Sequence, residues 1–298
     1  MVVVTLEECV VFARDGFRWF CSTKSRPVSV AVILVFGAIK LHIYLSKRSR
    51  RKKWATAGRD VVVLHGFPRE RFSPGTSPYV LKLETYLRLA KIPYVMDFTE
   101  PLGPKGLSPW ITLNGEEFAD SQLVIEHLGR QYNKDFSSGL TEVQRAVART
   151  FNIMACEHLA WGLRFWRYSV DCCRGLIQST SQVSLFLRLA LFFLRWKVLK
   201  ALWIQGTGRH TQKEVEHMVR QDLAAISHYL GEKPFLMGME PCEVDCTMFG
   251  FLTQIMYNYP GSPYITMLID DFPNLQMYQF RLRDLLWPDW NECLNPPK

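Results

Sequence analysis

Several patterns that would fix a protein's class at once are missing from this sequence. Its eight cysteines include no C-x-x-C pair, and they fall mostly inside apolar segments instead of forming a dense, regular disulfide framework. No spacing typical of a zinc finger, an RNP motif or a KH motif is present. We therefore expect free, buried thiols in a reducing compartment, no metal site and no nucleic-acid partner.

The chain also lacks the features of a cleaved targeting segment. No basic region precedes an apolar core as it would in a signal peptide, and Glu7, Glu8 and Asp15 disagree with the acid-poor composition of a mitochondrial presequence. Much of the positive charge is local, because the net charge is +8 and six lysines and arginines lie between Lys47 and Lys53. A local cluster argues against nucleic-acid binding by the whole protein.

From residue 28 to residue 45 the sequence is apolar except for Ser29, Lys40 and His42. As a helix this stretch would span about 27 Å, close to the hydrocarbon thickness of a bilayer. Lys40 lies near one end and can reach the headgroups, and the cations that follow place the remaining chain on the cytosolic side. We expect a single-pass anchor here; a buried helix and a peripheral apolar patch are the alternatives. The flanking segments are then an N-terminal stretch at 1–27 and, at 46–60, a basic linker that contacts anionic membrane lipid.

Residues 61–133 have the pattern of a small α/β domain. Ser77 and Pro78 open an amphipathic helix that ends near Lys91, with the serine in the N-cap and the proline in the first helical position. β-Branched and apolar runs predict short strands at 61–64, 94–98 and 110–113.

The end of this region predicts a hairpin and a second helix. Asn114 and Gly115 stand between apolar runs, which favours a two-residue turn into a strand at 117–118. Asp120 and Ser121 then open the next helix. The predicted order is strand, helix, strand, followed by two strands and a helix.

Beyond Leu140 the sequence shows no convincing strand alternation. Helical periodicity predicts helices at 142–168, 183–203, 212–230, 245–257 and 274–287. Within 183–203 a stripe of apolar residues at helical spacing predicts packing in the core: Leu185, Leu189, Phe192, Trp196, Leu199 and Trp203. Four cations exclude a membrane span there, and a basic helix on a membrane surface is the alternative.

This order of elements resembles the glutathione S-transferase fold, an α/β plus all-α architecture. The resemblance implies a thioredoxin-like N-terminal domain at 61–133 and an all-helical C-terminal domain at 140–290, here preceded by the membrane anchor helix. Four local motifs carry it, namely Ser77-Pro78-Tyr79 at the first helix, Pro109 as the cis-proline before the third strand, the acidic-serine pair Asp120-Ser121, and Asp245 as the capping aspartate of a C-terminal helix.

Other segments resemble the failed axon connections family, which is similar to the metaxins. They are LKLETYLRLAKIPY at 81–94, the Pro109-Trp110-Ile111 step, Phe235-Leu236-Met237-Gly238 and the terminal Leu286-Trp287-Pro288-Asp289-Trp290. The resemblance implies an apolar segment ahead of a transferase-like body, a link to axon development, and a homodimer or another transferase-fold partner.

Ser77 is the candidate catalytic residue. Transfer of glutathione needs an ionised thiol, and a hydroxyl at a helix N-terminus favours the thiolate through its hydrogen bond and the helix dipole. Ser73 and Thr76 are alternates in the same loop, and no tyrosine follows the first strand, so only a serine-type mechanism stays open. The competing interpretation is that Ser77 only caps its own helix.

The resemblance assigns Pro109, Asp120 and Ser121 to glutathione binding. A helix start with free amides and a hydroxyl binds a carboxylate such as the γ-glutamyl end of glutathione, although helix capping alone also explains the Asp-Ser pair. Asp245 has a structural role, and Cys242 occupies the place where its capping box usually has serine or threonine. Cys242 and Cys246 lie one helical turn apart, but two thiols do not complete a metal site.

Three functional hypotheses follow. The first is a membrane-tethered, cytosol-facing binding or adaptor module of the failed axon connections type. The second is a serine-type glutathione transferase, and the third is a metaxin-like component of an organelle membrane.

Overall fold

The structure is a computed structural model that describes residues 57–180 and 185–294, together with most positions between 37 and 54. The chain divides into two compact units, residues 1–56 and residues 57–298. In the first unit the described positions are helical. Residues 28–36, 39 and 43 of the expected anchor lie outside the described residues. No helix within the described part is long and apolar enough to cross a membrane.

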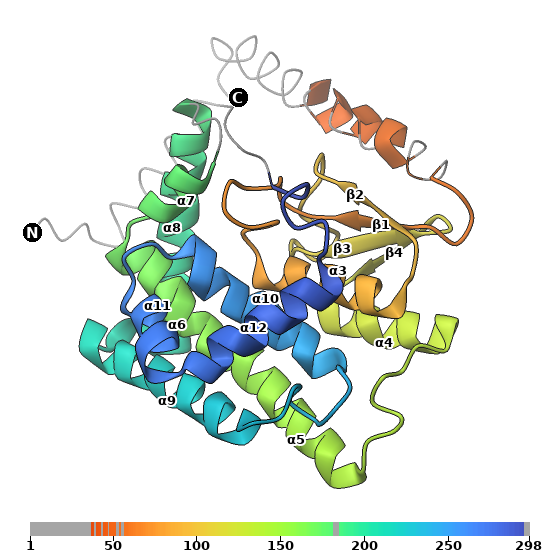
Figure 1. The fold of residues 1–298 in the computed structure, drawn as a ribbon. Helices are drawn as coiled ribbons and strands as arrows, with labels where there is room; N and C mark the ends of the chain where they lie inside the picture. Colours follow the sequence, from red (N-terminus) through yellow and green to blue (C-terminus); the bar gives the residue numbers. More distant parts are fainter. Residues whose placement is uncertain are drawn as a thin grey trace, which may run out of the picture. The chain divides into compact units, whose positions relative to one another are not determined.

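A four-stranded sheet forms one side of the second unit (Figure 1). Its strands are β1 (Val62–His65), β2 (Tyr94–Asp97), β3 (Trp110–Leu113) and β4 (Glu116–Ala119), in the order β2-β1-β3-β4. β2 is parallel to β1, whereas β3 is antiparallel to both β1 and β4. Asn114 and Gly115 both have positive φ in the turn between β3 and β4, so the predicted hairpin is confirmed.

Two helices pack on one face of this sheet: α3 (Pro78–Ala90) and α4 (Ser121–Tyr132). Alternate strand residues such as Leu64 and Ile111 point toward Leu83, Leu87 and Val124, and together they form a closed apolar core. The strand-helix-strand, strand-strand-helix order predicted from the sequence is therefore present, and this half is thioredoxin-like.

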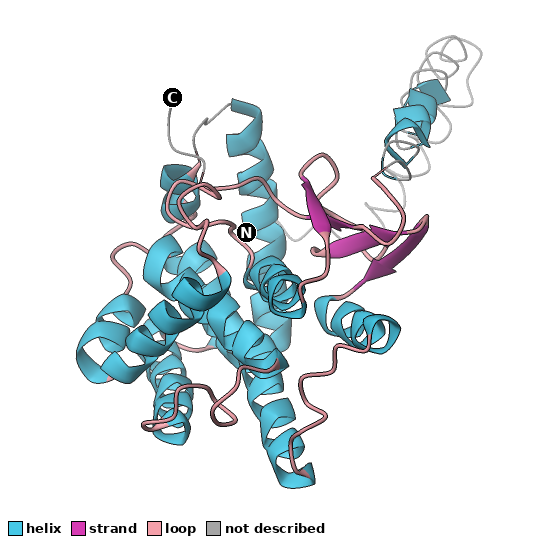
Figure 2. Cartoon of the chain, turned by 45° about the vertical axis from the view of Figure 1, so that its right-hand side comes forward, coloured by secondary structure: helices cyan, strands magenta, loops and turns pink. Residues whose placement is uncertain are grey.

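The remaining chain is helical (Figure 2). A continuous run covers the segment predicted at 142–168: α5 (Glu142–Ile153), a π-helical stretch (Met154–Leu159), α6 (Ala160–Phe165) and a second π-helical stretch (Trp166–Val170). The helices that follow are α7 (Arg174–Ser179), α8 (Leu185–Gln205), a 3₁₀ turn (Thr207–Arg209), α9 (Gln212–Leu230), α10 (Glu243–Asn258), α11 (Pro263–Thr266), a π-helical stretch (Met267–Asp271) and α12 (Pro273–Leu286).

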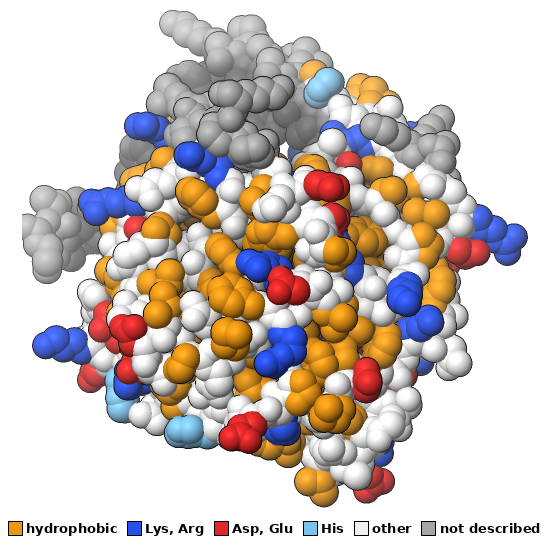
Figure 3. All heavy atoms as spheres, in the orientation of Figure 1, with side chains coloured by type: hydrophobic (Ala, Val, Ile, Leu, Met, Phe, Trp, Pro, Cys, Tyr) orange, Lys and Arg blue, Asp and Glu red, His pale blue; other side chains and the backbone are white. Residues whose placement is uncertain are grey.

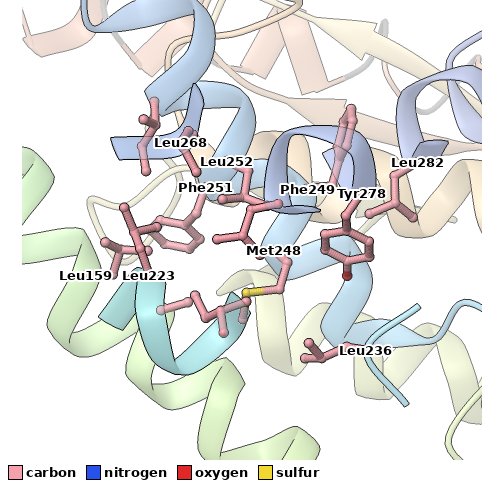
Figure 4. Packing of buried hydrophobic residues seen from close by; sticks show 14 of the residues in the cluster. Leu159, Leu223, Leu236, Met248, Phe249, Phe251, Leu252, Leu268, Tyr278 and Leu282 are labelled. Atoms are coloured by element: carbon pink, nitrogen blue, oxygen red, sulfur yellow. The ribbon is translucent and has the colours of Figure 1, made fainter. Parts of the chain in front are cut away.

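Helix α10 is the centre of the helical half. Thirteen of its 16 residues are buried, so neighbours surround it on nearly all sides. Figure 4 shows Met248, Phe249 and Leu252 of α10 among side chains from other helices, including Tyr278 and Leu282 of α12. The same helix packs against α3, and this contact joins the two halves of the second unit.

Helix α8 corrects one prediction. The stripe expected to pack in the core is largely on the outside, because Leu189, Phe192, Trp196 and Trp203 are all exposed. The row that faces the body contains Leu202, which packs with Phe165 and Val215, and it includes Leu199 from the predicted stripe. The sequence pattern was misleading because this inner row also holds Arg195, a residue that the apolar stripe had excluded.

Candidate functional site

The register of the sheet brings the ends of all four strands into one row. His65 pairs with Asp97 on β2 and with Trp110 on β3, and Trp110 pairs with Ala119 on β4. The residues just beyond this row therefore lie at the same edge: Pro109 before β3, Asp120 after β4, and the loop that leads from β1 to α3. The Ser108–Pro109 peptide bond is cis.

Side chains tie this row together. The His65 ring is fully buried, stacks on the Trp110 ring at a centroid distance of 3.7 Å, and hydrogen-bonds through its two nitrogens to Asp97 (3.0 Å) and Thr112 (2.9 Å). Burial lowers the pKa of His65, and the neighbouring Asp97 carboxylate opposes that shift. The strand ends therefore form a fixed base for the site.

Ser77 lies at the start of α3 and is partly exposed. Its backbone is extended, and its Oγ accepts a hydrogen bond from the Val80 N–H at 3.5 Å, the long limit for such a bond. Pro78 occupies the first helical position, as the sequence predicts. Among the described residues no acceptor receives the hydroxyl proton of Ser77, so this O–H can donate to a bound group.

The alternate hydroxyls in this loop differ from Ser77. Ser73 is fully buried and donates to Asn258 Oδ1 (2.9 Å) and to the Gly75 carbonyl (3.0 Å), so its proton is already engaged. Thr76 is fixed through its carbonyl, which accepts from Arg167 at 3.0 Å. The hydrogen bonds of Ser73 exclude it, and Ser77 is the remaining hydroxyl that stands at the N-cap of α3.

The helical half holds the β1–α3 loop in place. Gln254 and Asn258 of α10 both donate to the Gly75 carbonyl, at 2.8 and 3.2 Å. On the same helix Gly250 approaches α3 so closely that an added Cβ would meet the Pro78 carbonyl oxygen. These residues could not be predicted from the sequence, because they lie more than 170 positions from the loop and no local pattern marks them.

The start of α4 offers a second hydroxyl. Asp120 caps the helix, since its Oδ1 accepts from the N–H groups of Gln122 (2.9 Å) and Leu123 (3.2 Å). Its φ of 88° is strained for a residue with a side chain, and such strain costs about 1–3 kcal/mol and concentrates at functional sites. Ser121 is buried, and in the described part of the chain its hydroxyl has no hydrogen-bond partner.

A buried lysine joins the two helix starts. Lys82 of α3 donates from Nζ to Gln122 Oε1 of α4 and to Asn152 Oδ1 of α5, both at 2.8 Å. Burial lowers the pKa of Lys82, and the two side chains that accept from its Nζ are neutral amides. The sequence contained a signal for it, because a lysine stood among the apolar residues of the α3 stripe, but the prediction treated that stripe only as packing.

Asp245 lies away from these helix starts and holds α10 to the turn before it. Its carboxylate accepts from the N–H groups of Leu236 and Cys242, each at 2.8 Å, and from the Tyr278 hydroxyl. Burial raises the pKa of Asp245, and of the Cys242 and Cys246 thiols close to it. Within the described ranges no group of three or more His, Cys, Asp or Glu side chains could hold a metal ion.

Comparison with protein families and solved structures agrees with this architecture. The glutathione S-transferase N-terminal domain family matches residues 78–172, and the glutathione S-transferase C-terminal domain family matches residues 219–282. Among solved structures, the beta-etherase LigF from Sphingobium sp. strain SYK-6 superposes with a TM-score of 0.55 at 17% identity, over 74% of this chain and 94% of that chain. This likeness establishes the fold.

Three characterised relatives are similar in sequence. Failed axon connections of Drosophila melanogaster is 35% identical over 254 residues, which are 78% of this chain and 60% of that protein. Isoprene-epoxide–glutathione S-transferase of Rhodococcus sp. (strain AD45) is 28% identical over 75% of this chain and 98% of its own length. Metaxin-2 of Mus musculus is 20% identical over 71% of this chain and 83% of its own length.

The Drosophila relative is longer than the part that matches, because this chain covers only 60% of it. The matched part nevertheless runs through both halves of the transferase fold. The chain is therefore a glutathione S-transferase-fold protein that is similar to failed axon connections and to the metaxins.

Proposed function

We propose that this protein binds glutathione where α3 and α4 begin, at the cis-Pro109 edge of the sheet. The observation that carries the proposal is the pair of hydroxyls, Ser77 and Ser121, whose protons have no acceptor among the described residues. Each stands at a helix N-terminus, where backbone N–H groups and the helix dipole favour a negative charge. The Rhodococcus relative, named as a glutathione S-transferase, supports this ligand.

The functional groups of glutathione determine which residue of the site contacts which part of the tripeptide. Ser121, at the start of α4, binds the γ-glutamyl carboxylate, and Lys82 lies close to that position because its Nζ donates to Gln122. Ser77 donates to the thiol sulfur. Pro109 lies between the two helix starts and contacts the cysteinyl part of the tripeptide.

At the level of the cell, the protein acts as a tethered binding or adaptor module. Residues 28–45 anchor it in a membrane, the basic linker at 46–60 contacts anionic lipid, and the transferase fold faces the cytosol. A role in axon development is supported by the Drosophila relative's name, and a second transferase-fold chain is the partner that the fold favours.

A second candidate function is serine-type glutathione transfer. The available proton on Ser77 favours it, because donation to the sulfur, together with the dipole of α3, would lower the thiol pKa and raise the thiolate fraction. The transferase relative supports it as well. Binding without turnover and binding with turnover use the same residues, so an experiment must separate them.

The test combines retention on immobilised glutathione with a conjugation assay on the full chain. We expect the wild type to be retained and to elute with free glutathione. Ser77→Ala keeps the protein on the resin in either case, but lowers conjugation by about 100-fold if Ser77 activates the thiol. Ser138→Ala, on the exposed loop after α4, is the control. A wild type that passes through the resin overturns the proposal, and a retained wild type without conjugation selects the binding module.

A further inference from the structure

Helix α8 presents a large apolar surface to the outside. Among the side chains of α8 that the structure describes, from Arg188 onward, seven aliphatic and aromatic ones are exposed, and the exposed fractions reach 66% for Phe193, 64% for Trp196 and 67% for Ile204. We define the outer face of α8 by six residues at helical spacing: Leu189, Phe193, Trp196, Lys200, Trp203 and Ile204. A surface helix normally places such residues toward the core, so this arrangement requires an explanation.

The outer face is held outward by the opposite side of the helix. Leu202 is buried against Phe165 and Val215, and Arg195 donates from Nε to the Tyr168 carbonyl at 2.8 Å. Rotating α8 to bury its aromatic residues would remove Leu202 from this cluster and leave the Tyr168 carbonyl without its partner. The orientation therefore follows from specific contacts.

The charged side chains of α8 are all of one sign. Arg188, Lys197 and Lys200 are exposed on the helix, and the sequence has no acidic residue from Cys172 to Lys213. Two cations lie over exposed rings: Lys200 Nζ is 5.7 Å from the Trp196 ring, and the Arg209 guanidinium is 5.6 Å from the Trp203 ring. By contrast, the face shown in Figure 3 mixes acidic and basic side chains.

We propose that the outer face of α8 docks on the surface of an anionic lipid bilayer. Aromatic and aliphatic side chains enter the boundary between headgroups and acyl chains, while lysine and arginine contact lipid phosphates and carboxylates. The helix lies in the plane of the interface, since its opposite side stays packed on the body at Leu202.

Two other partners for the outer face of α8 fit its positive charges less well. A second copy of this chain meeting the same face across a twofold axis would bury Lys200 against a helix that has no acidic residue to pair with it. An uncharged protein partner would bury these cations without acidic groups to pair with them, and lysine is depleted at the centre of protein interfaces. A lipid surface supplies the anions and accepts the apolar groups.

This surface is independent of the glutathione site and of the anchor proposed at 28–45. It would bring the helical half of the second unit onto a membrane whichever segment delivers the protein there. The experiment must therefore report on α8 itself rather than on binding of the whole chain.

The test is hydrogen exchange of the full chain with vesicles of phosphatidylcholine alone and of phosphatidylcholine with about 30% phosphatidylserine. We expect amides in 188–205 to exchange at least about fivefold more slowly with the anionic vesicles only. Equal exchange with both vesicles, while the protein sediments with both, overturns the proposal. Protection of 188–205 without lipid that grows with protein concentration assigns the face to a second copy and overturns it too.

Charge reversal gives a matched pair of variants. Lys197→Glu with Lys200→Glu should weaken the anionic-vesicle effect at least about tenfold, since each basic residue near such a surface adds roughly a factor of five. Arg130→Glu with Arg149→Glu makes the same change of net charge at exposed sites on α4 and α5 and should leave the effect in place. Equal loss in both double variants would mean attraction by net charge alone and would overturn the assignment to α8.

Discussion

Helices α10 and α8 both carry long apolar side chains, but only α10 is surrounded by the rest of the protein. α10 lies between α3 and the other helices, and its polar residues fix the loop that leads to Ser77. α8 packs by one narrow row and leaves Phe193 and Trp196 exposed. The difference shows that apolar content alone does not say whether a helix builds a core or a binding surface.

The largest expected effect is in α10. Phe249 is fully buried and stacks near Trp287, so Phe249→Ala should lower the free energy of unfolding by about 3–5 kcal/mol. Urea unfolding followed by circular dichroism measures it. A loss below about 1 kcal/mol would mean that α10 is not the centre of the core.

The second-largest effect on stability is expected at Glu70, a buried carboxyl in the loop between β1 and α3 that α10 holds in place. Burial raises the pKa of Glu70 to about 7, and the nearby Arg167 only partly opposes this. As the pH rises from about 4.5, the unfolded chain releases the proton first, so stability falls until the folded pKa is reached and is then constant. Glu70→Gln should therefore be more stable than the wild type by about 3 kcal/mol at pH 8 and nearly equal at pH 4.5.

Unfolding at these two pH values tests this directly. A variant that is equally stable or less stable at pH 8 would show that the Glu70 carboxylate is well compensated in the folded protein.

The close approach of α10 to α3 gives a smaller effect. Gly250→Ala places a methyl group against the Pro78 carbonyl, and overpacking of this kind costs about 1–3 kcal/mol. Because the shift acts on the first turn of α3, retention on immobilised glutathione should also decline. Unchanged stability and retention would mean that α3 moves freely against α10.

The smallest effect on stability belongs to α8. Phe193→Ala is the same chemical change as Phe249→Ala, but it should alter the free energy of unfolding by less than about 0.5 kcal/mol. Its effect should appear instead in vesicle binding. A destabilisation comparable to that of Phe249→Ala would show that the outer face of α8 is packed within the protein.

The sequence predicted the parts of the fold that local chemistry determines. Ser77 before Pro78 marked the start of α3, and Asn114-Gly115 marked the hairpin, because caps and tight turns depend on a few adjacent residues. The sequence could not predict which side of α8 is buried. Both of its sides contain apolar residues, so helical periodicity does not distinguish the buried side from the exposed one.

Some residues of the candidate site could be predicted from the sequence, and others could not. Ser77, Pro109, Asp120 and Ser121 stood in recognisable motifs. Gln254 and Asn258, which hold the loop before Ser77, carry no local signal, because only the folded chain brings them to Gly75.

The most direct test of the central claim is calorimetric titration of glutathione into the full chain and into two serine variants. We expect one glutathione per chain, with affinity at least about tenfold weaker in Ser121→Ala, because a hydrogen bond to a charged group is worth about 1.5–3 kcal/mol. Ser138→Ala should bind as the wild type does. Absence of binding heat in the wild type, or equal affinity in Ser121→Ala, would contradict a glutathione site at the starts of α3 and α4.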